Sequence, residues 1–219
     1  AYCYAILTVP MYPFQMRFVL AAAISALAAA AVGLALGAPT LRLRGDYLAI
    51  VTLGFGEVVK VTLRNLEQVT GGMKGLNPVP PPGAGVRLGG MDLGLAFAVD
   101  PRWFYYLALL VLAGVVVAMR RLESSRLGRA WVAVREDELA AAAMGISAAK
   151  VKLSAFAMSS AVAGLAGCLY AASLSTTADP NAYDFNRSIM VLCAVILGGL
   201  GSIPGTLLGV ALLVGFDTV

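Results

Sequence analysis

Four long stretches of the chain contain no charged side chain. They cover residues 18–41, 103–119, 153–178 and 188–216. A helix that crosses a bilayer needs about 20 mainly apolar residues, with a usual range of about 17–25, so each stretch can hold a crossing. Only 13% of all residues are charged and 60% are hydrophobic, whereas soluble domains have about 25% charged residues. The sequence therefore predicts a protein that spans a membrane several times.

The hydrophobic pattern predicts an all-α, polytopic helical bundle. We expect five to six membrane segments, one of them broken, in a single membrane domain over residues 1–219. The helical ranges are 1–9, 15–37, 46–65, 103–119, 151–174 and 188–216. Pro39 is expected to end the second of these helices, and Asp46 to cap the third. Because both chain ends adjoin apolar runs, we expect further spans beyond them.

The loops between these helices differ in charge. Residues 120–152 carry seven basic and four acidic side chains, and cytoplasmic loops of membrane proteins are enriched in basic residues. Residues 65–102 carry three basic and three acidic side chains and are rich in Pro and Gly. We therefore expect a cytoplasmic loop at 120–150 and a folded external loop at 65–102.

Several classes of function are excluded by what the sequence lacks. It has no His and no GxxxxGK[ST] phosphate loop. Its three cysteines, Cys3, Cys168 and Cys193, do not have the spacing of metal ligands. Basic residues do not form a patch with interleaved aromatic residues, so a nucleic-acid partner is not indicated. We expect no enzyme, metal site or cofactor on this chain, and any ATP hydrolysis on another chain.

A group of residues in the third helix is the candidate for a translocation path. Glu57 is a carboxylate within an apolar helix, and intramembrane charges usually face the protein interior or a water-filled path. It could meet an ammonium group, or it could simply pair with Lys60, three residues on. The path candidates are Thr52, Gly54, Phe55, Gly56 and Glu57.

The apolar run 188–216 is interrupted by glycines and a proline. Such a break needs partners for the exposed backbone groups, and in transporters it often lies near the transport path. A broken or re-entrant segment and a tight hairpin between two shorter helices both remain possible. Glycines four residues apart, such as Gly33 and Gly37, are expected to be packing sites. The residues of the break are Gly198, Gly199, Gly201, Pro204 and Gly205.

Five blocks in this order resemble LivM-type permeases, the membrane subunits of branched-chain amino-acid ABC importers. They are LRLRGDYLAIVTLGFGE (41–57), TGGMKGL (70–76), GRAWVAVREDELAAAAMGI (128–146), KLSAFAMSSAVAGLAGCLYA (152–171) and SIMVLCAVILGGLGSIPGTLLG (188–209). The resemblance implies that this chain carries branched-chain amino acids across a bacterial inner membrane. It also implies two ATPase subunits, a second permease subunit and a periplasmic binding protein as partners.

The resemblance further implies that residues 128–146 contact the ATPase. The local chemistry fits a short docking helix with small side chains, a charged end, and Gly145 ending the helix in a left-handed conformation. The residues assigned to this contact are Arg135, Glu136, Asp137, Glu138, Ala141, Met144 and Gly145. Alternatives are the same fold with urea, short amides or other amino acids as cargo, an ion-coupled secondary transporter, and a structural membrane subunit.

Overall fold

The computed structural model describes most of the chain. The residues described are 1–9, 17–40, 46–82, 87–88, 91–92, 101–174, 183, 185–199 and 201–217. Most of them are helical, and the described strands form one short antiparallel pair. The predicted fold class, an all-α membrane bundle, is confirmed.

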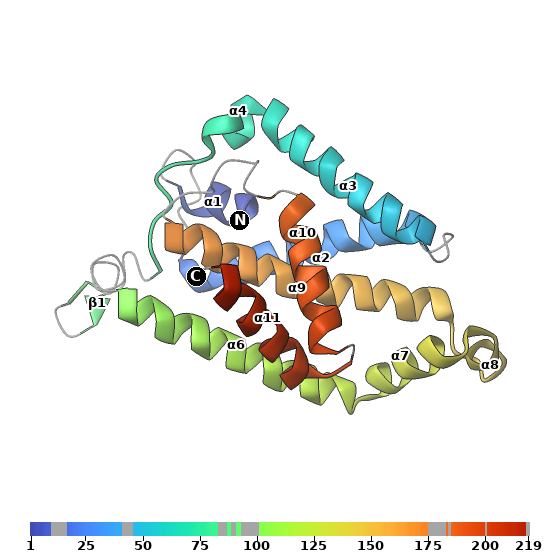
Figure 1. Cartoon of the computed structure of the whole chain (residues 1–219). Coiled ribbons are helices and arrows are strands. Elements are labelled where there is room, and N and C mark those ends of the chain that lie inside the picture. The colour runs from blue at the N-terminus through green and yellow to red at the C-terminus, as the bar shows by residue number, and fades with distance from the viewer. Residues whose placement is uncertain are drawn as a thin grey trace.

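The elements follow one another along the chain as shown in Figure 1. The longer helices are α2 (Phe18–Thr40), α3 (Asp46–Asn65), α6 (Pro101–Glu123), α7 (Arg126–Glu136), α9 (Ala148–Leu174), α10 (Phe185–Gly198) and α11 (Ile203–Asp217). The short elements are α1 (Tyr2–Thr8), α4 (Glu67–Thr70), the 3-10 helix η1 (Gly72–Lys74), α8 (Glu138–Ala143), and the strands β1 (Arg87–Leu88) and β2 (Met91–Asp92).

The end of α2 differs from the prediction. The sequence placed it at residue 37, before Pro39, but the helix continues to Thr40. Pro39 is the next-to-last residue of the helix, so its missing N–H group removes a single hydrogen bond from the final turn. The bounds of α3 match the predicted 46–65, but the side chain of Asp46, its expected cap, lies outside the described residues.

Three helices in the described part of the chain are long and apolar enough to cross a membrane. They are Phe18–Pro39 in α2, Arg102–Glu123 in α6 and Ala148–Leu174 in α9. The apolar parts of α10 and α11, Ser188–Gly198 and Ile203–Leu213, are shorter than a full crossing. The protein is therefore a multi-pass membrane protein that combines long spans with a shorter helical pair.

The helices α2 and α9 form the most extensive contact between two elements. Small residues allow their backbones to approach closely. A Cβ atom at Gly164 of α9 would lie 2.6 Å from the Cβ of Ala29 in α2, and one at Gly33 of α2 would overlap the side chain of Ser160 in α9. Both glycines thus act as packing sites, the role that the sequence analysis gave to Gly33.

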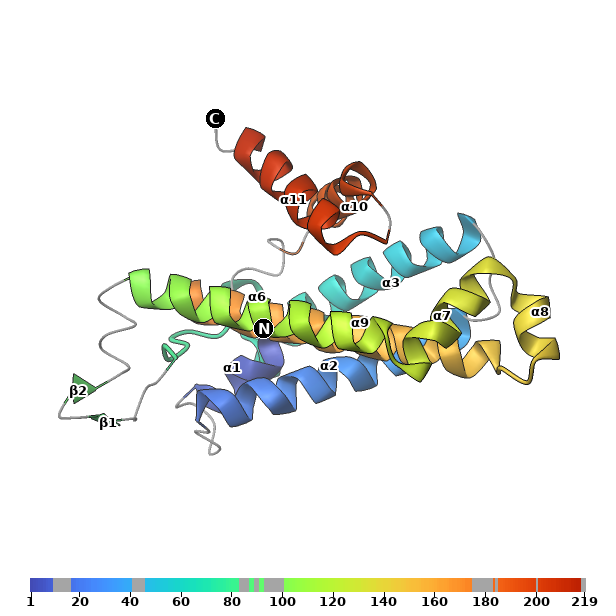
Figure 2. The ribbon, with the colours of Figure 1, turned by 90° about the horizontal axis from the view of Figure 1, so that it is seen from below.

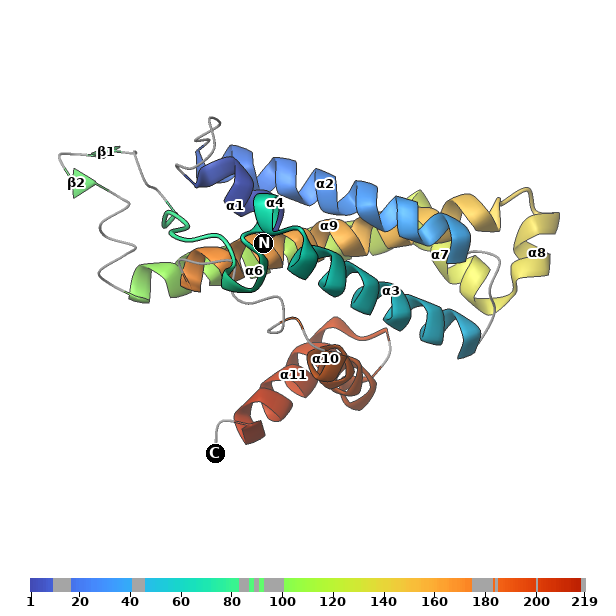
Figure 3. The ribbon, with the colours of Figure 1, turned by 90° about the horizontal axis from the view of Figure 1, so that it is seen from above.

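The two polar ends of the molecule lie far apart. The helices α7 and α8 lie at one end of the long helices, and β1 and β2 at the other, in all three views (Figure 1, Figure 2 and Figure 3). The C-terminal end of α2 and the N-terminal end of α3 lie at the α7–α8 end (Figure 2). This is the arrangement required if residues 120–150 and 65–102 face opposite sides of a membrane.

A small core stabilises the end opposite α7 and α8. Tyr4 and Val9, at α1, are almost completely buried together with Val79 and with Cys168 of α9. The hydroxyl of Tyr4 donates a hydrogen bond of 3.4 Å to the carbonyl oxygen of Pro80. The segment after η1 is therefore folded onto α1. The residues of the predicted external loop at 83–86, 89–90 and 93–100 lie outside the described part.

The helices α10 and α11 fold back on each other. A Cβ atom at Gly205 would overlap the carbonyl oxygen of Gly198, and one at Gly209 would overlap that of Ala194. The turn between the helices contains Gly199 and Gly201, each with φ of 93°, a conformation that residues with a Cβ rarely adopt. The structure therefore has two shorter helices joined by a turn, in place of one helix that continues through the break.

Candidate functional site

The segment that was predicted to contact an ATPase consists of α7 and α8. Ser125 caps α7, since its hydroxyl oxygen accepts a hydrogen bond of 3.3 Å from the backbone N–H of Gly128. A Cβ atom at Gly128 would overlap the backbone carbonyls of Leu122 and Glu123 at the end of α6. The turn from α6 to α7 is therefore tight, and it fixes where α7 begins.

Trp131 joins α7 to the start of α9. Its indole N–H lies 2.9 Å from Oγ of Ser154 and 3.1 Å from the carbonyl oxygen of Val151, and donates to both. Val134 and Ala141 are buried against Val151 in a small cluster shared by α7, α8 and α9. Apolar burial and a hydrogen-bonded indole together hold α7 against α9.

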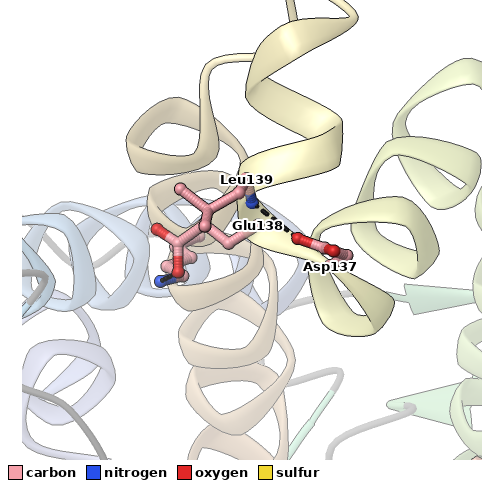
Figure 4. Close-up of polar contacts among 4 residues, drawn as sticks. Asp137, Glu138 and Leu139 are labelled. Carbon is pink, nitrogen blue, oxygen red and sulfur yellow. Dashed lines mark hydrogen bonds and ion pairs between the residues drawn. The ribbon is translucent and has the colours of Figure 1, made fainter.

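Asp137 is the only residue between α7 and α8, and it serves both helices. Its backbone N–H closes the last turn of α7, and its side chain caps α8. Oδ1 accepts hydrogen bonds from the backbone N–H groups of Leu139 and Ala140, at 2.8 and 3.0 Å; the bond to Leu139 is visible in Figure 4. This carboxylate therefore satisfies two of the free N–H groups at the start of α8.

An ion pair connects α8 to α9. Nζ of Lys152 lies 2.7 Å from Oε2 of Glu138, and the two side chains are 36% and 43% exposed. A pair this exposed contributes about 0–1 kcal/mol, because water and salt screen it. Glu138 was predicted to contact a partner, but in this structure its carboxylate is engaged within the chain.

The most exposed apolar side chains of this segment are on and directly after α8. Leu139 is 82% exposed and Met144 is 83% exposed. Gly145 has φ of 81° and directs the chain away from α8 toward α9. Ala141, also predicted to touch a partner, is only 4% exposed, so in this conformation its neighbours have to make any such contact.

Leu139 and Trp131 were not among the site residues predicted from the sequence. A usable signal was present for Leu139, which is a large apolar residue in a short helix between charged residues and alanines. No comparable signal marked Trp131, because its hydrogen bonds depend on the distant start of α9.

Two of the path candidates in α3 face other helices. Thr52 and Phe55 line a recess of about 200 Å³ together with Gly33 and Leu36 of α2 and Phe156 and Ser160 of α9. Gly56 lines a different recess, which also contains Lys60 and Tyr183. A Cβ atom at Gly54 or Gly56 would meet no other side chain within 4 Å. The five candidates are therefore distributed over more than one surface of α3.

Glu57 is paired with Lys60. Nζ of Lys60 lies 2.8 Å from Oε2 of Glu57, and these side chains are 20% and 45% exposed respectively. The structure therefore contains the ion pair that the sequence offered as the simpler role for Glu57. Within the described residues no group of three or more His, Cys, Asp or Glu side chains could hold a metal ion.

The structure brings the Gly/Pro break at residues 198–205 close to the segment 128–146 that was predicted to contact an ATPase. A recess of about 450 Å³ is lined by Glu123 of α6, Trp131 and Arg135 of α7, and Gly201 and Thr206 at the α10–α11 turn, among other residues. Nη1 of Arg135 is 3.4 Å from the position that a Cβ of Gly201 would occupy. This proximity of two separately predicted groups was not expected from the sequence.

A bundle of long apolar helices with a charged helical segment at one end is a multi-pass membrane protein. The whole chain, residues 1–219, matches the family described as branched-chain amino acid transport system / permease component. The chain belongs to this family, which is the family that the sequence blocks resemble.

Individual relatives agree with this assignment. The chain is 41% identical to the high-affinity branched-chain amino acid transport system permease protein LivM of Escherichia coli (strain K12), over 98% of this chain and 53% of that protein. It is 40% identical to the LivM protein of Salmonella typhimurium (strain LT2), over the same shares. A probable LivM of Methanocaldococcus jannaschii is 29% identical over 78% of this chain and 47% of that protein.

The chain thus spans about half the length of these curated relatives. No solved structure matches the chain.

Proposed function

We propose that this chain forms part of the translocation unit of an ATP-driven importer, and that α7 and α8 contact its ATPase subunit. One observation carries the proposal. Leu139 and Met144 extend into solvent at the end of a segment that is fixed to α9 by Trp131 and by the Glu138–Lys152 ion pair. Large exposed apolar side chains on a firmly held helix are typical of a protein interface.

The further partners follow from membership in the family. We propose a second permease subunit, two ATPase subunits and a periplasmic binding protein, assembled in the inner membrane of a bacterium. ATP-driven closure of the ATPase subunits would move α7 and α8 and switch the path from one side to the other. This chain contributes no cofactor and no chemistry on the substrate.

Branched-chain amino acids are the proposed cargo, because the names of the relatives carry that substrate. Urea, short amides and other amino acids remain as alternatives within the same fold. The recess lined by Thr52 and Phe55 is the proposed part of the path, since it lies between α2, α3 and α9. Glu57→Gln tests whether the carboxylate binds the substrate ammonium group; we expect leucine uptake to be retained, because Glu57 already pairs with Lys60.

ATP-dependent uptake of labelled leucine into proteoliposomes tests the proposal. The native permease is reconstituted with its partner subunits, and uptake should stop when the ATPase subunits are omitted. Uptake that needs an ion gradient instead of ATP would contradict an importer of this class.

A double variant, Leu139→Ala with Met144→Ala, tests the contact itself. Binding of the ATPase subunit should weaken by at least about tenfold, because truncating an anchor at the centre of an interface costs about 2 kcal/mol or more. Leu127→Ala is the control, since Leu127 is an exposed leucine at the other end of the same segment. Equal binding by the double variant and the control would rule out the α8 surface as the docking site.

A further inference from the structure

Few contacts attach the α10–α11 hairpin to the other described helices. The two helices pack mainly on each other, and α10 also touches α3. Their close contact uses glycines, at Gly198, Gly205 and Gly209, whose missing side chains let the two backbones meet. Figure 2 shows the hairpin set apart from the layer of α2, α6 and α9. A movement of the hairpin as one unit would therefore disturb few other helices.

The side chain of Arg135 extends from α7 to the tip of this hairpin. It lines the recess between α6, α7 and α11 together with Trp131 and Val132. Positions 131, 132 and 135 lie on one side of α7, because residues three and four apart are neighbours on a helix. Trp131 is anchored to α9 by its indole N–H, so α7 presents Arg135 to the hairpin from a fixed base.

Gly201 is the residue that Arg135 meets. A Cβ atom there would lie 3.4 Å from Nη1 of Arg135, whereas one at Gly199 would meet no atom within 4 Å. Both glycines have φ of 93°. Substitution is therefore strained at both positions, and only Gly201 also lies beside Arg135.

We propose that Arg135 is a positioning residue that connects the α7–α8 segment to the α10–α11 turn, so that displacement of α7 moves the hairpin. The inference rests on the proposed function and makes it more specific. It gives Arg135 a contact inside the permease, where the sequence analysis had assigned it to the ATPase interface. The ATPase then acts on α8, α8 acts on α7 through Asp137, and α7 acts on the hairpin through Arg135.

A set of substitutions in the complete, reconstituted importer tests this connection. The quantity measured is leucine transported per ATP hydrolysed. Arg135→Ala should lower it at least about fivefold, the lower end of ordinary coupling between sites, while the ATPase subunit still binds. Gly201→Ala should lower it more than Gly199→Ala does. In proteins that also carry Arg135→Ala, the two glycine variants should transport the same amount of leucine per ATP hydrolysed. The reason is that the Arg135 side chain, which lies beside Gly201 only, is then absent.

Three outcomes of that experiment would overturn the proposal. One is an unchanged ratio of transport to ATP hydrolysis in Arg135→Ala. Another is a difference between Gly201→Ala and Gly199→Ala that persists without Arg135, since it would show that the difference has another origin. Loss of ATPase binding in Arg135→Ala would also overturn the proposal, because it would show that Arg135 lies at the interface with the ATPase.

A cross-link tests the contact without relying on transport. Arg135→Cys and Ser202→Cys are combined in a variant in which Cys3, Cys168 and Cys193 are replaced by serine, and a short bismaleimide is added. Ser202 lines the same recess as Arg135. The control pair, Met144→Cys with Ser202→Cys, should not react, because Met144 is exposed near α8 and does not line the recess.

We expect the cross-link to form and to stop uptake. No cross-link, or full uptake by the cross-linked protein, would contradict the proposed connection. If the cross-link forms but the native protein, with Arg135 in place, shows no ATP-dependent uptake, the contact holds and the importer function fails. The failure of the two proposals can thus be told apart.

Discussion

The pairs α2–α9 and α10–α11 both pack through small residues, but different atoms meet. In α2–α9 the glycines mostly face side chains, as Gly33 faces Ser160. In α10–α11 they face backbone, as Gly205 faces the carbonyl oxygen of Gly198. A side chain can change rotamer or be replaced, whereas a helical carbonyl is held by the hydrogen bonds of its own helix. Residue spacing alone does not distinguish these two kinds of contact.

The two helix pairs also differ in the lengths of their helices. The long helices α2 and α9 spread their contact over many turns, while α10 and α11 have 14 and 15 residues and rely on a few glycines. We therefore expect the hairpin to be much less tolerant of added atoms.

The largest effect is expected for Gly205→Ala in α11. The added methyl group would overlap the carbonyl oxygen of Gly198, so the helices must separate, at a cost of about 1–3 kcal/mol or more. The midpoint of thermal unfolding in detergent should fall by several degrees. Gly215→Ala in the same helix is the control, because its Cβ would meet nothing within 4 Å. Equal midpoints would show that α10 and α11 are not in backbone contact.

An intermediate effect that can be reversed is expected for Gly33→Ala in α2. The methyl group would meet the Ser160 side chain, at a cost toward the low end of about 1–3 kcal/mol. Because the obstacle is mainly a side chain, Ser160→Gly in the same protein should recover most of the loss. The thermal midpoints of the single and double variants measure this recovery. Additive losses would contradict the side-chain contact.

The smallest effect is expected for Gly114→Ala in α6. A Cβ at this position would meet no atom within 4 Å, and Ala is favoured over Gly within helices by up to about 1 kcal/mol. Thermal stability in detergent should stay the same or rise slightly. A clear loss of stability would mean that another element covers this face of α6 in the assembled protein.

Helix positions were well predicted from the sequence because they follow from run length and charge. The predicted 46–65 matches α3, and the predicted 151–174 lies within α9, Ala148–Leu174. Charges near α6 misled the prediction slightly: the expected 103–119 stopped at the first arginines, but Arg120 and Arg121 belong to its last turn. Basic side chains are favourable there, since they interact with the helix dipole.

The chemistry within the α7–α8 segment could be predicted only in part. The cap at Asp137 had a local signal, because an Asp directly before a run of good helix formers is a typical N-cap. Its carboxylate binds backbone N–H groups of α8, which a count of charges does not show. The approach of Arg135 to Gly201 had no signal at all, since it depends on how α7 and α11 are placed in space.

The junction at Asp137 has a mechanical consequence. Because one residue both ends α7 and caps α8, the two helices are joined by a single residue, which leaves little chain to extend between them. A displacement of α8 would therefore be transmitted to α7 with little loss. Inserting a glycine after Asp137 would lengthen this junction, and it would also move the Asp137 carboxylate away from the N–H groups of α8 that it caps.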